Sequence, residues 1–96
     1  STRLQFIQQD DHGDKSTRTL HFSSSASASW MQGYLPTAAR NRAWEVSIQG
    51  EVDSDGATRE GDCLIITRNN VRRFIVISAS ADRKGSDVII VEETLH

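Results

Sequence analysis

The sequence predicts an all-β domain of antiparallel strands, arranged as a sandwich or barrel with little or no helix. Short segments rich in apolar residues recur along most of the 96 residues, and Gly, Asn, Asp and Ser crowd the gaps between them. No segment of about 10–12 residues keeps a helical period; the best candidate, residues 37–42, is long enough for one turn only. Parallel strands would need helical crossovers, so we expect antiparallel pairing.

Seven segments of one domain, residues 1–96, are expected to form strands. The serine-rich stretch 23–29 is low in complexity and is expected to be a loop or sheet edge leading to Trp30. Asn69 and Asn70 are expected to form a turn. The expected strands are residues 3–8, 17–22, 27–35, 43–52, 63–67, 71–80 and 87–92.

Alternation along the strands predicts which side chains are buried. Trp44 and Val46 fall on one face of their strand, with Glu45 and Ser47 on the other. Residues 74–77 and 89–91 are instead apolar on both faces. Strands of this type are covered on both sides or carry an interface. A homodimer through sheet faces is therefore one possible partner arrangement.

Composition argues against several classes of partner. A net charge of -2 gives no bulk attraction to nucleic acid, and 6% aromatic content disfavours an OB-type barrel for single strands. No apolar run is long enough to span a membrane, and no secretory leader opens the chain. The single cysteine, Cys63, cannot form an internal disulfide and is expected to be a small buried filler. These features predict a cytoplasmic protein.

Residues 43–92 resemble the latter half of a cupin barrel. Residues 46–52, Val-Ser-Ile-Gln-Gly-Glu-Val, match the strand and glycine turn that end the first cupin motif, and Asp55-Gly56 matches the hairpin after it. Gly61-Asp62 followed by an apolar strand matches the start of the second motif. The resemblance implies an antiparallel double-stranded β-helix, the cupin-like jelly-roll barrel.

The chain departs from the family at the metal ligands. Residues 37–42 hold no His, Asp or Glu where the first motif has its histidines, and Arg72 stands at the second-motif histidine. Arginine does not ligate metal, so we expect no metal and no cofactor. His12, His21 and His96 are expected to be solvated or partly packed imidazoles.

The whole chain resembles the metal-free C-terminal cupin domain of pirin-like and quercetin-dioxygenase-like bicupins. An apolar strand, a turn at His12-Gly13 and a strand carrying His21 follow the order of that domain. Arg42-Ala43-Trp44 matches an Arg-aromatic step before the glycine-turn strand. The resemblance implies a structural or accessory half, with an N-terminal cupin domain as partner.

Five residues are candidates to line a pocket at the barrel mouth. Arg72 is the sharpest, because an inward guanidinium could hold a carboxylate or phosphate bidentately; the alternative is that it simply reaches solvent. Trp44, like Trp30, is expected in the core rather than at a ligand. The five candidates are Arg72, Trp30, Tyr34, Glu45 and Arg40.

Three functions stay open at this point. The first is a metal-free accessory domain without catalytic activity. The second is a small-molecule module that binds an anionic ligand at the barrel mouth. The third is a cupin-type dioxygenase or isomerase, for which no set of catalytic groups can be named.

Overall fold

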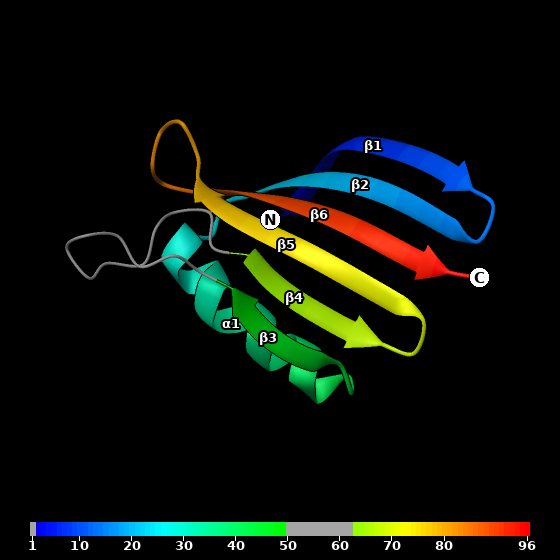
Figure 1. Cartoon of the computed structure of the whole chain (residues 1–96). Helices are drawn as coiled ribbons and strands as arrows, with labels where there is room; N and C mark the ends of the chain where they lie inside the picture. Colours follow the sequence, from blue (N-terminus) through cyan, green and yellow to red (C-terminus); the bar gives the residue numbers. More distant parts are fainter. Residues whose placement is uncertain (1, 50–62) are drawn as a thin grey trace.

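The computed structural model describes residues 2–49 and 63–96, which form an antiparallel six-stranded sheet and a helix (Figure 1). The strand order across the sheet is β1-β2-β6-β5-β4-β3. The elements are β1 (Thr2–His12), β2 (Lys15–Ser24), α1 (Ala28–Asn41), β3 (Glu45–Gln49), β4 (Cys63–Arg68), β5 (Val71–Ala79) and β6 (Ser86–Leu95).

The expected cupin-like barrel is wrong, because the sheet is open. β1 and β3 lie at its two edges and do not pair with each other. The hairpin of β1 and β2 adds to the edge of β6 and extends the sheet instead of folding back as a second layer. α1 takes the place of that layer on one face. Short antiparallel strands have the same residue pattern in an open sheet and in a barrel, so the pattern could not separate them.

The prediction of little or no helix is also wrong. Residues 27–35, expected as a strand, contain the helix cap Ser27 and the first half of α1. The Ser27 hydroxyl accepts a hydrogen bond from the Trp30 amide at 3.1 Å, and its carbonyl accepts the first helical bond from Met31. Gly33 and Pro36 lie inside the helix and lower its intrinsic propensity. Burial of one face outweighs that cost.

The other six expected strands are present, and four of them have wider bounds. The strand expected at 71–80 ends at Ala79, and the one expected at 43–52 is observed as Glu45–Gln49, with residues 50–52 outside the described part of the chain. Two-residue loops close the first hairpin at Gly13-Asp14 and the β4–β5 hairpin at Asn69-Asn70, as expected for the asparagine pair. Gly13 and Asn69 take positive φ angles of 58° and 54°, which these residues tolerate well. The expected glycine turn at Gly50, the hairpin at 55–56 and the pair at 61–62 lie outside the described residues.

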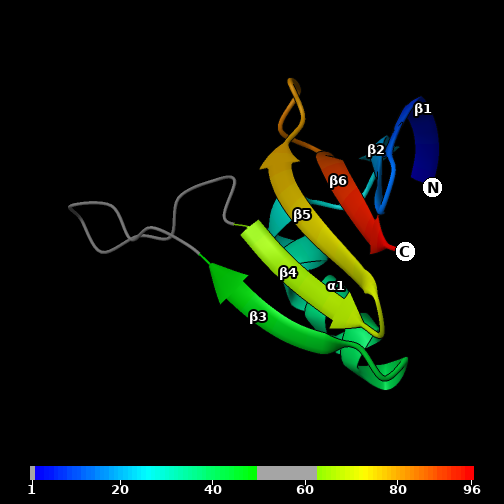
Figure 2. The ribbon, with the colours of Figure 1, turned by 45° about the vertical axis from the view of Figure 1, so that its right-hand side comes forward.

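The core lies between α1 and one face of the sheet (Figure 2). Met31, Leu35 and Ala39 recur every four residues and face the strands. Trp44 is buried, as its alternation predicted, while Glu45 and Ser47 on the other face are exposed. Met31, Ala39, Trp44, Leu64, Ile66, Ile75, Ile77 and Val88 make up the buried cluster.

The link between β2 and α1 is fastened to the start of β6. Ser86 is fully buried and donates a hydrogen bond to the Ala26 carbonyl at 2.8 Å. Gly85 approaches the Ser24 backbone so closely that a Cβ there would lie 2.2 Å from the carbonyl oxygen. These contacts help to direct α1 to one face of the sheet.

Candidate functional site

The face of the sheet opposite α1, the open face, carries a block of apolar side chains. The strand register gives two adjacent rows across β4, β5 and β6. Because neighbours along a strand point to opposite faces, these residues lie opposite the buried Leu64, Ile75 and Val88. The rows are Ile65–Phe74–Val91 and Cys63–Val76–Ile89, called the apolar patch below.

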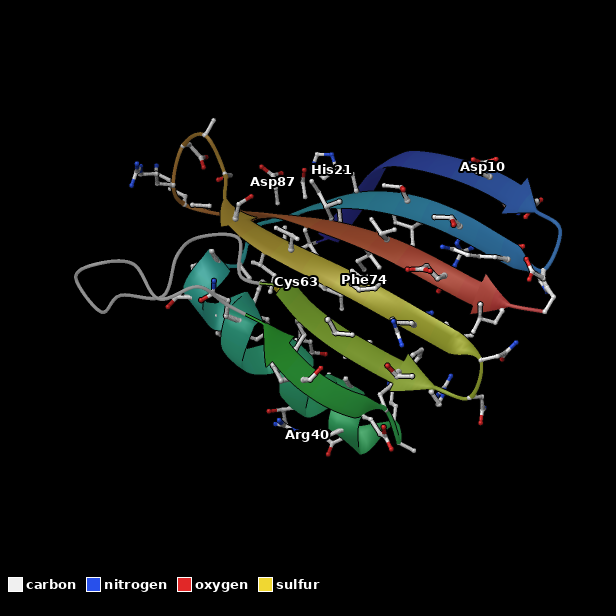
Figure 3. The ribbon with its side chains drawn as sticks, in the orientation of Figure 1. Asp10, His21, Arg40, Cys63, Phe74 and Asp87 are labelled. Atoms are coloured by element: carbon white, nitrogen blue, oxygen red, sulfur yellow. The ribbon has the colours of Figure 1, made fainter. Side chains whose placement is uncertain are left out.

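No element among residues 2–49 and 63–96 covers the apolar patch. Phe74 and Cys63 lie on the side of the sheet turned to the viewer in Figure 3, while α1 lies behind it. Ile89 is 41% exposed, whereas Val88 beside it on the α1 side is 2% exposed. An apolar cluster that monomeric packing leaves in water is typical of a binding surface.

Charged and polar groups border the apolar patch at both ends of its strands. At one end, Arg72 and Glu93 are paired in register, and Glu93 forms an ion pair with Lys15 at 2.9 Å. The Arg72 guanidinium leans over the Phe74 ring, 5.9 Å from its centroid. At the other end, Asp87 accepts a hydrogen bond from Ser23 at 3.3 Å. An apolar centre surrounded by polar and charged residues is the usual composition of a protein interface.

His21 lies beside the apolar patch on β2, where it is paired in register with Ile89. Its Nε2 atom is 3.4 Å from an Asp87 carboxylate oxygen, a distance that suits an ion pair only when the imidazole is protonated. His96 hydrogen-bonds to Ser16 near the end of the chain. His21 is partly buried and His96 is exposed, so both match the expectation of solvated or partly packed imidazoles.

The structure divides the five predicted site residues between the two sides of the sheet. Arg72 on β5 and Glu45 on β3 lie in one row of the open face, separated by Thr67. Arg40 lies on α1, behind the sheet (Figure 3). Trp30 and Tyr34, also on α1, stack with their ring centroids 4.7 Å apart. No single pocket can therefore contain all five.

The expectation that Trp30 is a core residue is wrong. Its side chain is 55% exposed, because it stands on a helix flank away from the Met31–Ala39 side. Tyr34, one turn further along, is 48% exposed. Cys63 is partly exposed instead of fully buried, because its strand leaves it on the open face.

Two surface hollows lie among the described residues, and some of their polar groups are engaged within the chain. The larger, about 470 Å³, lies between the β2–α1 link and the loop before β6. There the Asp82 carboxylate accepts hydrogen bonds from the Ser80 hydroxyl and the Lys84 amide, which hold its pKa below the ordinary value. In the smaller, about 240 Å³, Arg18 is paired with Glu92 at 3.1 Å. These contacts maintain the fold locally.

Within residues 2–49 and 63–96, no three side chains of His, Cys, Asp or Glu come together in a way that could hold an ion. The same residues contain no helix long and apolar enough to cross a membrane.

The open-face residues Ile65, Ile89 and Val91 were not among the sequence-based candidates. The signal that could have found them is the two-sided apolar character of residues 74–77 and 89–91. Once α1 covers one side of these strands, the apolar residues on the other side remain for an interface. Comparisons with family models, with curated protein sequences and with solved structures find no match to this chain.

Proposed function

We propose that this chain is a non-catalytic binding module that binds another protein chain through the open face of its sheet. The apolar patch is the observation that carries the proposal. It presents six adjacent side chains in two rows, within a border of charged and polar groups. A sheet face suits the apolar face of another sheet better than a small ligand, which needs a concave site.

The accessory role implied by the cupin resemblance stays a prediction, as does the attached N-terminal cupin domain. The family relationship itself likewise stays a prediction, while its expected barrel is replaced by an open sheet. The proposal keeps the non-catalytic role and assigns it a surface. An anionic ligand at a barrel mouth is not carried forward, because there is no barrel mouth. A cytoplasmic location also remains a prediction.

The reactivity of Cys63 tests the proposal, because this thiol lies in the apolar patch and is the single cysteine of the chain. We expect a thiol-reactive maleimide to label Cys63 slowly when the face is bound and faster when it is free. Labelling should be measured on concentrated purified protein and in an extract of the cells that naturally produce it. The Phe74→Asp variant should react at the fast rate in both, because a buried carboxylate opposes docking.

A cysteine outside the face provides the matched control. Gln32→Cys in a Cys63→Ser background places a thiol on an exposed position of α1 and should react at one rate in every sample. Equal Cys63 labelling of the wild type and Phe74→Asp, in both purified protein and extract, would contradict the proposed function.

A further inference from the structure

We propose that the partner at the open face is a second copy of this chain, placed by a twofold axis that runs along the strands between β5 and β6. This inference rests on the proposed function and names its partner. In this arrangement Phe74 of one copy faces Val91 of the other, and Val76 faces Ile89. Arg72 of each copy then faces Glu93 of the other.

Sheet geometry limits the choice of axis. Two sheets that pack face to face keep their strand directions within about 30° of each other, at a separation of about 10 Å. A twofold axis between them must then run nearly along the strands or nearly across them. Both choices can place the apolar patch of one copy on that of the other, so the charged border decides between them.

An axis across the strands brings like charges together. It exchanges the two ends of the strands, so Glu93 at one end of β6 would face Asp87 at the other end. By symmetry, this unfavourable contact would occur twice. An axis along the strands keeps each end opposite itself and avoids this contact between the central strands. The like-charged pair that it creates, Glu45 of β3 opposite Asp10 of β1, lies at the sheet edges, outside the four central strands.

The lateral position of the axis follows from Arg72. An axis directly over β5 would place Arg72 opposite its own copy. If the axis is moved by half a strand spacing toward β6, about 2.4 Å, β5 of one copy lies over β6 of the other copy. Because Arg72 and Glu93 are paired in register, this shift brings the guanidinium of each copy opposite a carboxylate, with two such pairs per dimer. Among the described residues, no carboxylate forms an ion pair with Arg72 within its own chain.

The size of the face predicts a weak dimer. The four central strands, β2, β6, β5 and β4, with about seven residues each span about 19 by 23 Å, or roughly 440 Å² in projection. Two such faces lie below the roughly 1,600 Å² of a standard stable interface. We therefore expect self-association that depends on concentration in the micromolar range or above.

A charge-swap experiment tests this arrangement. We expect the wild type to dimerise with rising concentration in sedimentation equilibrium, and Arg72→Glu and Glu93→Arg each to weaken the dimer at least about tenfold through like-charge contacts. An equimolar mixture of the two variants should recover a heterodimer, because each glutamate then meets an arginine of the other copy. Lys84→Glu makes the same charge change as Arg72→Glu, but on the exposed loop before β6, and should leave dimerisation unchanged.

The mixture shows whether the substitutions weaken the dimer through contacts between copies or through strain within one chain. Arg72 and Glu93 are also neighbours in one sheet, and strain of that origin would persist on mixing. The proposal that the partner is a second copy would be contradicted if the mixture stayed monomeric, or if the wild type stayed monomeric at every concentration. If either variant fails to fold by circular dichroism, the wild-type measurement still decides. Cys63 protected only in the cell extract would leave the proposed function standing with a different partner.

Discussion

The two faces of the sheet use the same strands for different purposes. On β5, Ile75 and Ile77 are 4% and 3% exposed beneath α1, whereas their neighbours Phe74 and Val76 lie on the face without a helix. One set stabilises the monomer, and the other is available to a partner. A run of apolar residues in a single strand therefore combines two different requirements, stability and binding.

The difference between the two faces predicts that substitutions at two adjacent residues of β5 change the free energy of unfolding by very different amounts. Ile75→Ala should lower the free energy of unfolding by about 2–4 kcal/mol, because it leaves a cavity in the core. Phe74→Ala should cost about 1 kcal/mol in the monomer, because its side chain is already partly hydrated. Urea denaturation of both variants at low protein concentration measures the difference. Equal losses would show that the open face is as well packed as the core.

A second prediction concerns the link that directs α1 to one face. Gly85→Ala should destabilise the protein by about 1–3 kcal/mol, because the new Cβ meets the Ser24 carbonyl and the backbone must shift. Gly33→Ala is the matched control within α1, where a Cβ meets nothing within 4 Å. Thermal unfolding should show that this control raises stability by about 0.5–1 kcal/mol. A neutral Gly85→Ala would contradict the close approach of the link to β6.

The smallest expected effect comes from Asp82 in the loop before β6. Hydrogen bonds from the Ser80 hydroxyl and the Lys84 amide lower its pKa from the ordinary value of 3.8. A lowered pKa in the folded state stabilises the fold above the pKa of the unfolded chain, and this contribution is lost as the pH falls through the folded value. The stability difference between wild type and Asp82→Asn should therefore shrink as the pH falls below 3.8. A constant offset at every pH would rule out this titration as the cause.

Much of the sheet was predictable from local pattern, and its closure was not. The Asn69-Asn70 turn and the alternation around Trp44 are local signals, and the structure confirms both. Closure depends on which strands pair at the edges, and the sequence pattern of each strand carries no such information. The cupin motifs around Gly50 and Gly61 lie outside the described residues.

The helix was missed because two signals in it conflict. Gly33 and Pro36 oppose a helix, whereas the Ser27 cap and the spacing of Met31, Leu35 and Ala39 favour it. Weighing the cap and the four-residue spacing together would have predicted α1. Without α1, the apolar residues on both sides of β5 indicated only a strand that is covered on both sides or carries an interface. With α1 in place, one side becomes core and the other a candidate interface.

Side-chain NMR of dilute protein with a soluble paramagnetic probe tests the central claim most directly. At a concentration where the protein is monomeric, we expect strong broadening of Phe74 and Ile89 signals and little effect on Ile75 and Ile77. That result would establish one hydrated and one buried face on the same strands. Equal protection of all four residues in the monomer would contradict the account, because it would require both faces of β5 and β6 to be covered within one chain.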